Sequence, residues 1–222
     1  MYTPPPDFTL LRTADGSATL RSERLGEQYH SVHGAVQESL HVFLRNGFEA
    51  HPADPLDVLE IGLGTGLNLL LTLQAAGTRR VRYRALEPFP ITVEQLHALG
   101  HEGRLMPAQR QWFMQAMSAP EGTWQELSST FTFQRSARLA QAFEEAAVAD
   151  VIYFDAFGPA TQPEMWTLDV MARMYHALRS GGLLVTYCAK GEVRRTLQAA
   201  GFQVERLPGP PGKREMLRAR RS

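Results

Sequence analysis

The sequence predicts an α/β fold with a mostly parallel central sheet. Apolar runs of strand length alternate with helical patterns from about residue 57 onward, as expected for a parallel sheet covered on both faces. Only PGPPGK separates the last two runs, which is too short for a helical crossover, so they should form an antiparallel hairpin. Seven strands are expected, at residues 57–62, 81–88, 130–136, 150–157, 182–189, 202–207 and 214–219.

Helical patterns occupy the segments between these strands. Apolar residues at three- and four-residue steps from Val32 to Leu44 predict a first helix, which HPADP (51–55) ends. Further helices are expected at 67–76, 93–102, 139–147, 168–178 and 192–201. Residues 1–28 read as an N-terminal extension containing a hairpin, which leaves 29–222 as one domain.

Composition is that of an ordinary globular protein. The chain has 222 residues and a formal net charge of zero, so no overall electrostatic attraction to nucleic acid or membrane follows. The single cysteine, Cys188, excludes an internal disulfide and a Cys-based zinc site. No apolar run approaches the ~20 residues that span a bilayer, and MYTPPPDFTL lacks the pattern of a signal peptide. We therefore expect a cytoplasmic protein without a metal.

A glycine-rich loop follows the first strand of the expected sheet. LEIGLGTGLN places Gly62, Gly64 and Gly66 before a helix, where glycine permits a tight turn and close approach of a ligand to the backbone. A dinucleotide-binding G-x-G-x-x-G would need glycine at Leu67. This disfavours a nicotinamide oxidoreductase. A plain strand-to-helix turn is the alternative for the loop taken alone.

Two acids accompany this loop. Glu87 ends the second strand about 20 residues after the glycines, where a carboxylate accepts hydrogen bonds from ribose hydroxyls. Glu60 lies within an otherwise apolar strand, which favours a buried polar partner over a surface position. Together with the glycines they predict a nucleoside-cofactor site.

Asp155 ends the fourth strand, directly after the apolar residues 151–154. Ligands of open α/β sheets bind at the carboxyl ends of the strands, so this carboxylate should border the cofactor. It would hold a substrate amine, orient the lone pair and stabilise positive charge developing on nitrogen, while Phe157 and Trp166 would enclose a flat substrate. The alternative is a cap on the following turn.

Several longer motifs resemble one family, the methyltransferase domain of bacterial tRNA 5-methylaminomethyl-2-thiouridine enzymes, of MnmC or stand-alone MnmD type. They are YHSVHGAVQESLHVFL (29–44), GLGTGLN (62–68), FDAFGPATQPEMW (154–166), VRRTLQAAGF (193–202) and GKREML (212–217). The resemblance implies a Rossmann-like class I methyltransferase that uses S-adenosyl-L-methionine. Its implied reaction is methylation of the aminomethyl group on the wobble uridine, in the anticodon stem-loop of tRNA.

The resemblance also implies roles for individual residues. Asp155 would lie at the reacting amine, and Glu38, from the segment 29–38, near the sulfonium or the methionine amine. The other expected cofactor residues are Glu60, Gly62, Gly64, Gly66, Asn68, Glu87 and Ser136. Ser136 stands where relatives often have an acid near the adenine. A backbone contact at Ser136 or Ala137 would replace the contact that the acid makes with the adenine. Gln162 stands where relatives usually have Asn, and we expect it to preserve the chemistry.

Basic residues near the last strands are the expected tRNA contacts. Solvated surface positions are the alternative for each of them. The candidates are Lys190, Arg194, Arg195, Lys213 and Arg214.

Two other functional classes remain open. An aminopropyltransferase resembling spermidine synthase also joins a glycine loop to an acidic motif, although such enzymes usually have Asp where Thr65 stands. A non-catalytic binding module on the same fold is the second alternative, and the retention of both Glu87 and Asp155 argues against it.

Overall fold

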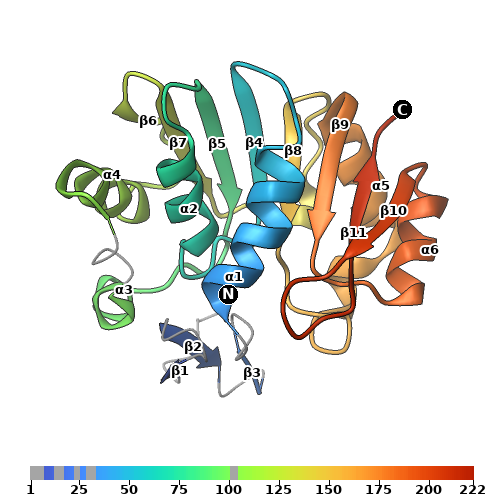
Figure 1. Ribbon diagram of the computed structural model, residues 1–222, viewed down its shortest axis with the longest axis horizontal. Helices are drawn as coiled ribbons and strands as arrows, with labels where there is room; N and C mark the ends of the chain where they lie inside the picture. The colour runs from blue at the N-terminus through green and yellow to red at the C-terminus, as the bar shows by residue number, and fades with distance from the viewer. Residues whose placement is uncertain (1–7, 13–17, 23–25, 29–33, 101–104) are drawn as a thin grey trace.

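A central eight-stranded sheet forms the middle layer of the computed structural model, which describes residues 8–12, 18–22, 26–28, 34–100 and 105–222. Its strand order is β10-β11-β9-β8-β4-β5-β7-β6 (Figure 1). The strands are β4 (Leu56–Ile61), β5 (Val81–Leu86), β6 (Gln125–Ser128), β7 (Phe131–Ser136), β8 (Ala149–Phe154), β9 (Leu178–Thr186), β10 (Gln203–Pro208) and β11 (Glu215–Arg220).

Helices cover both faces of this sheet. They are α1 (Ala35–Ser39), which continues into the π-helix η1 (Leu40–Phe48), α2 (Leu67–Ala75), α3 (Val93–Leu99), α4 (Pro107–Met117), the 3₁₀ helices η3 (Ala140–Ala142) and η4 (Pro163–Trp166), α5 (Leu168–Ala177) and α6 (Gly191–Ala199). A separate three-stranded antiparallel sheet is made of β1 (Phe8–Arg12), β2 (Ala18–Ser22) and β3 (Glu27–Gln28).

Pairing within the central sheet confirms the expected topology. β7, β5, β4, β8 and β9 are parallel neighbours, so β8 lies directly beside β4. The final hairpin is antiparallel, and β11 also pairs antiparallel with β9. The carboxyl ends of the parallel strands therefore meet at one edge, which faces the small β1–β3 sheet in Figure 1.

Three expectations about the elements were wrong. The sheet has eight strands because β6 adds an antiparallel edge strand beside β7; its sequence QELS carries no apolar alternation. The helix expected at 139–147 is only the short η3, since Phe143 turns to an extended conformation and buries its ring. Helix α4 was not expected, and Pro107 stands at its start.

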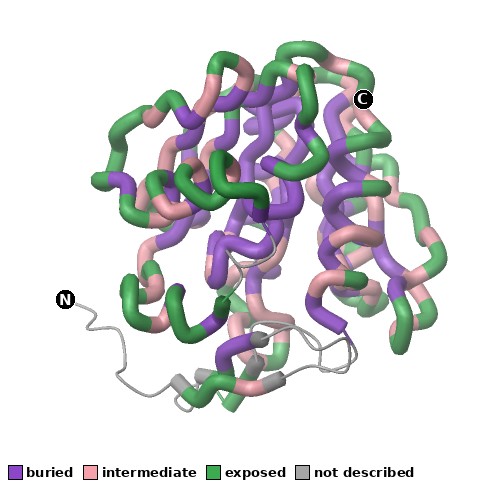
Figure 2. Tube along the Cα trace, turned by 60° about the vertical axis from the view of Figure 1, so that its left-hand side comes forward, coloured by how far each residue is buried: buried purple, intermediate pink, exposed green. Residues whose placement is uncertain are grey.

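The core consists of two clusters, one on each face of the sheet. The first joins α1, η1, α2 and α4 to residues such as Val58, Tyr83 and Tyr153. The second joins α5 and α6 to Leu59, Phe154 and other strand residues. Figure 2 shows the buried strands enclosed between helices with exposed outer sides, which is the three-layer arrangement expected for a parallel sheet.

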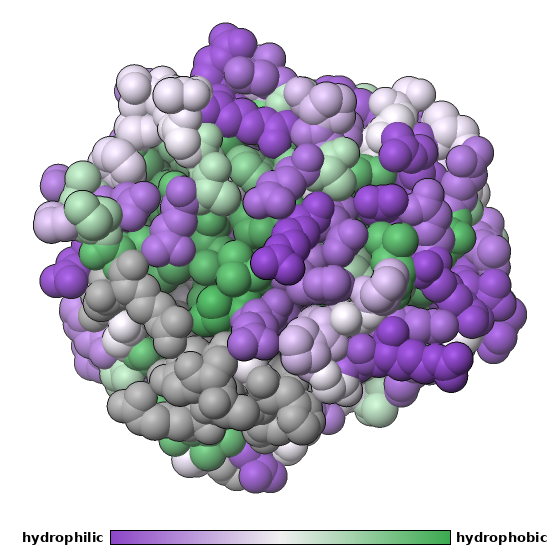
Figure 3. All heavy atoms as spheres, viewed as in Figure 1, coloured by the Kyte–Doolittle hydropathy of each residue, from purple (hydrophilic) through white to green (hydrophobic). Residues whose placement is uncertain are grey.

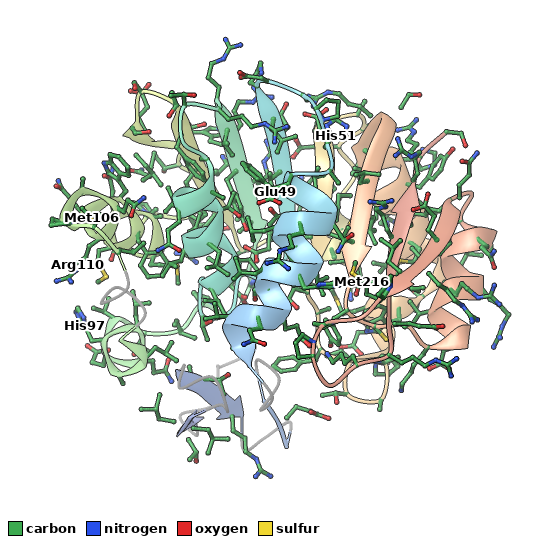
Figure 4. All side chains as sticks on the ribbon, in the orientation of Figure 1. Glu49, His51, His97, Met106, Arg110 and Met216 are labelled. Atoms are coloured by element: carbon green, nitrogen blue, oxygen red, sulfur yellow. The ribbon has the colours of Figure 1, made fainter. Side chains whose placement is uncertain are left out.

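Helix α4 shows how the covering layer is divided between core and solvent. Phe113 is fully buried, whereas Met106, at the start of the helix, is 69% exposed. Met106 and Arg110 lie on the outer side of the helix in Figure 4. Figure 3 shows hydrophobic side chains at the surface between α1 and α4, where Leu40 and Trp112 are only partly buried.

Strand alternation places Glu60 on the face covered by α2. Val58 belongs to the first cluster, whereas Leu59 and Ile61 belong to the second. Because successive side chains point to opposite faces, Glu60 lies on the Val58 side, and it is fully buried. The sequence thus directs one acid of the first strand into the α2 layer.

The β1–β3 sheet contacts both sides of the carboxyl edge. Leu20 of β2 packs with Leu99 of α3, and the Thr161 hydroxyl donates a hydrogen bond to Glu27 of β3. This connects the N-terminal strands to the loop that follows β8. Within the described residues, no helix is long and apolar enough to cross a membrane.

Candidate active site

The tips of β4, β5 and β8 are held together by backbone hydrogen bonds. The Asp155 N–H donates to the Ile61 carbonyl at 3.0 Å, and the Gly62 N–H donates to the Leu86 carbonyl at 3.0 Å. Asp155 and the glycine loop are thus neighbours across the sheet, as the sequence predicts.

The glycine loop approaches its neighbours too closely for side chains. Gly62 has φ +88°, and a Cβ on it would lie 2.9 Å from the Asp155 carbonyl oxygen. Gly66 has φ +75°, and its Cβ would lie 2.6 Å from Met117 Sδ. At Gly62 the neighbour is backbone, so glycine is required there on grounds of space as well as conformation. At Gly66 the neighbours are side chains, and the positive φ is the main reason for glycine.

Glu87 closes the other side of this loop. Its Oε2 accepts the Gly64 N–H at 2.8 Å and its Oε1 accepts the Phe89 N–H at 2.9 Å. Burial raises the pKa of the carboxyl, and these backbone bonds oppose the shift. Each carboxylate oxygen has a second lone-pair site, so the group remains able to accept from a diol. A carboxylate placed in this way beside a glycine turn fits a nucleoside cofactor.

Asp155 belongs to a chain of buried hydrogen bonds. Asn68 Nδ2 donates to Asp155 Oδ2 at 2.8 Å and to Glu60 Oε1 at 2.9 Å. The Tyr83 hydroxyl donates to Glu60 Oε2 at 2.8 Å. Asn68 and Glu60 were expected at the cofactor; the structure links them to the candidate catalytic acid. Tyr83 was not anticipated, although its place on the α2 face follows from strand alternation.

The environment disfavours ionisation of both carboxyl groups. Burial raises the pKa of Asp155 well above its usual value, and the negative charge of Glu38 adds to the shift; the Asn68 hydrogen bond and Lys213 oppose it. Burial likewise raises the pKa of Glu60 well above its usual value, against the bonds from Asn68 and Tyr83. Asp155 is thus suited to accept a proton.

Glu38 and Lys213 form an ion pair beside Asp155. Lys213 Nζ lies 2.5 Å from Glu38 Oε2, and the two side chains are 32% and 12% exposed. Lys213 Nζ also lies 4.1 Å from the centre of the Tyr187 ring, whose hydroxyl donates to the Ala156 carbonyl. Lys213 was expected to contact tRNA, but its partner is Glu38. Tyr187 was not anticipated, because an aromatic residue after an apolar strand reads as core.

The loop after β8 is ordered by its own side chains. The Phe157 N–H donates to Gln162 Oε1 at 3.0 Å, and Trp166 Nε1 donates to the Phe157 carbonyl at 2.8 Å. Trp166 is only 6% exposed and packs edge-on against Phe154. The indole therefore supports the loop from within, and its expected contact with the substrate stays a prediction. Phe157 is partly exposed.

Ser136 lies at the tip of β7. Its carbonyl accepts the Glu87 N–H at 2.8 Å, and its hydroxyl accepts the Arg138 N–H at 3.2 Å. It lines a hollow with Leu86 and Phe143 on the face opposite α2. The backbone carbonyl of Ser136, and not its hydroxyl, thus contacts Glu87 at the carboxyl edge of the sheet.

Of the remaining basic candidates, Lys190 lies between β9 and α6, Arg194 and Arg195 lie in the first half of α6, and Arg214 lies in the turn between β10 and β11. Lys190, Arg195 and Arg214 are exposed, and Arg194 is partly buried. These segments are at the carboxyl edge of the sheet (Figure 1), the same edge as Asp155. Among the described residues, no group of three or more His, Cys, Asp or Glu could hold a metal ion.

Comparison with known proteins shows which family the C-terminal part of the chain resembles. Residues 136–222 match the sequence profile of a family described as S-adenosyl-L-methionine-dependent methyltransferase. The match covers the C-terminal part of the chain, from the tip of β7 onward. The matched segment includes Asp155 and strands β8 to β11. The cofactor is S-adenosyl-L-methionine (SAM), a nucleoside of the kind that the glycine loop and Glu87 fit.

The similar proteins include bifunctional enzymes named MnmC, for tRNA 5-methylaminomethyl-2-thiouridine biosynthesis. The chain is 35% identical to the protein of Cupriavidus metallidurans over 90% of its own length and 32% of the relative. For Aromatoleum aromaticum the identity is 31%, over 94% and 34%. The chain therefore spans about a third of the length of these relatives.

Two solved structures bear on the fold. MnmC2 from Aquifex aeolicus is similar with a TM-score of 0.76 and 26% identity, over 98% of this chain and 72% of that one. Spermidine synthase from Thermotoga maritima has a TM-score of 0.57 and 13% identity, over 99% and 72%. At that identity the second likeness shows a shared fold alone, so the methyltransferase assignment stands over the aminopropyltransferase alternative.

Proposed function

We propose that this methyltransferase transfers a methyl group to the primary amine of 5-aminomethyluridine, with or without a 2-thio group, at the wobble position of tRNA. The reaction would form the 5-methylaminomethyl group. The support is the pairing of a SAM-type glycine loop with Asp155 across adjacent strand tips, together with the similarity to the MnmC proteins.

The residues of the glycine loop would hold the cofactor. The cofactor would lie against the loop from Gly62 to Gly66, and Glu87, which accepts the Gly64 N–H, would also accept the ribose hydroxyls. SAM supplies an electrophilic methyl group carried by a sulfonium. The acidic cluster of Glu38, Glu60 and Asp155 lies beside that loop and suits a cationic ligand.

Asp155 would act on the substrate amine. An amine attacks carbon only when its lone pair is free, and primary alkylamines are protonated at neutral pH. A carboxylate that accepts a hydrogen bond from the amine orients the lone pair and stabilises the ammonium formed as the C–N bond is made. The substrate ammonium would lose one proton to solvent before attack, and the extra proton of the methylated amine would leave through Asp155, whose raised pKa favours that transfer.

The carboxyl edge would receive the anticodon stem-loop. Lys190, Arg194, Arg195 and Arg214 lie at this edge with little acidic competition: in the described part of the chain, only Lys190 of these four forms an ion pair, a 3.9 Å contact with Glu192. Phosphate contacts are made mainly by such side chains. The expected site of action is the cytoplasm, where tRNA is modified.

Methyl transfer to defined tRNA tests this function. The wild-type protein is incubated with SAM and tRNA bearing 5-aminomethyluridine, and the digested nucleosides are analysed by mass spectrometry. A gain of one methyl group on that nucleoside is expected, and no gain on tRNA with an unmodified wobble uridine. Transfer to neither tRNA would contradict the proposal.

The competing activities are measured in the same experiment. Decarboxylated SAM with a diamine would yield an aminopropylated product if the chain acted like a spermidine synthase. Calorimetry with SAM and NAD then separates a methyltransferase from an oxidoreductase. Tight tRNA binding without turnover in any arm would favour a non-catalytic module.

A further inference from the structure

A single amide joins the fully buried Glu60 carboxyl to the partly buried Asp155 carboxyl. Asn68 uses its one NH₂ group twice, toward Glu60 and toward Asp155, while its Oδ1 is buried without a hydrogen-bond partner. Asn68 stands at the second position of α2 and is 2% exposed. Its unsatisfied buried acceptor lowers the free energy of unfolding. This geometry favours a specific role for the amide.

We propose that Asn68 is a positioning residue, held by Glu60 and Tyr83, that fixes the Asp155 carboxylate for the substrate amine. The inference rests on the proposed function and extends it to three residues behind the reacting groups. The sequence alone suggested Asn68 and Glu60 as cofactor ligands, a different role.

The chain of hydrogen bonds has a fixed direction. Tyr83 donates to one oxygen of Glu60, and the other oxygen accepts one hydrogen of the Asn68 amide. This sets the amide plane and aims its second hydrogen at Asp155 Oδ2. With that oxygen occupied, Oδ1 of Asp155 remains to accept from the amine. A misplaced carboxylate would lose the alignment on which transfer depends.

Asn68 and Glu60 also have opposite electrostatic effects on the ionisation of Asp155. The Asn68 hydrogen bond favours the ionised form, and loss of that donor disfavours it. The Glu60 carboxyl and Asp155 disfavour each other's ionisation. Changing either residue should therefore move the acid limb of the pH–rate profile, in opposite directions.

Four variants test the hydrogen-bond chain: Asn68→Asp, Glu60→Gln, Tyr83→Phe and, as control, Tyr153→Phe. Tyr153 is also a fully buried tyrosine on the α2 face, but its hydroxyl lies 3.3 Å from Thr72 and does not contact Glu60. Single-turnover methyl transfer to tRNA with 5-aminomethyluridine is measured at saturating SAM from pH 6 to 9. The dissociation constant for S-adenosylhomocysteine is measured by calorimetry in parallel.

Asn68→Asp is expected to slow transfer by about 100-fold, as for a catalytic group displaced by an ångström, and to move the acid limb to higher pH. Glu60→Gln keeps an acceptor for Asn68, so it should retain most activity and move the limb to lower pH. Tyr83→Phe should slow transfer more than Tyr153→Phe. S-adenosylhomocysteine affinity should stay within a few-fold throughout.

Failure of the positioning role can be told apart from failure of the proposed methyl transfer. If the wild type transfers methyl groups while Asn68→Asp matches its rate and profile, the positioning role is wrong and the function stands. A fall in S-adenosylhomocysteine affinity equal to the fall in rate would instead make Asn68 a direct cofactor ligand, which also overturns the inference. If Asn68→Asp does not fold, equal rates for the two tyrosine variants overturn it.

Discussion

Lys213 Nζ lies 2.5 Å from Glu38 Oε2, so the turn between the last two strands is bound to the first helix. The pair stands beside Asp155 and contributes to the charge around it. A residue near the C-terminal end of the chain thus completes a site whose glycine loop lies about 150 residues earlier.

Replacement of Lys213 should affect the site more than tRNA attraction. Lys213→Met leaves Glu38 unpaired, so the free energy of unfolding should fall by about 1.5–3 kcal/mol, the range for a hydrogen bond to a charged group, and SAM should bind more weakly. Thermal unfolding and calorimetry measure both. Arg214→Met, at the adjacent exposed position, is the control; equal effects of the two changes would contradict the assignment.

The exposed basic patch should determine the salt dependence of tRNA binding. Replacing Lys190, Arg194, Arg195 and Arg214 by Gln should reduce the slope of log affinity against log salt by about 0.7–0.9 for each phosphate that the protein no longer neutralises. Arg80→Gln is the control, since this arginine pairs with Asp54 at the opposite edge. A slope that the fourfold change leaves unaltered would exclude the patch.

Glu60 should make wild-type stability fall as pH rises. Its folded-state pKa is raised well above 4.5, so above that pH the folded protein binds more protons than the unfolded chain, and stability declines by up to about 1.4 kcal/mol per pH unit. Glu60→Gln lacks this titration. Urea unfolding at pH 5 to 8 should therefore show that the free energy of unfolding of Glu60→Gln rises relative to that of the wild type as pH increases. A difference in free energy that stays constant over this range would contradict the raised pKa. Glu164→Gln, at the surface, is the control.

Gly62→Ala should damage the loop beyond the cost of its conformation. The φ of +88° alone costs roughly 1–3 kcal/mol for alanine, and the Cβ would also meet the Asp155 carbonyl at 2.9 Å. Gly77→Ala has a comparable φ of +55° with nothing within 4 Å. Denaturation should show Gly62→Ala to be the less stable variant, with SAM binding abolished; equal destabilisation would mean that the loop moves freely from Asp155.

The central sheet could be predicted from the sequence because buried parallel strands have continuous apolar runs. Residues 150–157 and 57–62 showed such runs, and their pairing followed from the order of the elements. β6 escaped prediction because a four-residue edge strand needs only one neighbour and little apolar surface. The residues of η3 have good helix propensity, but burial of the Phe143 ring ends the turn.

The site was predictable where a residue stands at a strand tip. Gly62, Glu87 and Asp155 could be placed beside one another from strand order alone. The contacts of Lys213 with Glu38 and of Trp166 with Phe157 depend on loop conformations, which sequence spacing does not define. The sequence therefore predicted a tRNA contact for Lys213 and a substrate contact for Trp166, and the structure adds the internal partners Glu38 and Phe157.

The central claim is that Asp155 accepts a hydrogen bond from the amine that receives the methyl group. The most direct test is single-turnover methyl transfer by Asp155→Asn at saturating SAM, since asparagine keeps the shape and removes the base. We expect a rate roughly 100-fold or more below the wild type, with SAM affinity changed only a few-fold. An unchanged transfer rate in this variant would contradict the account.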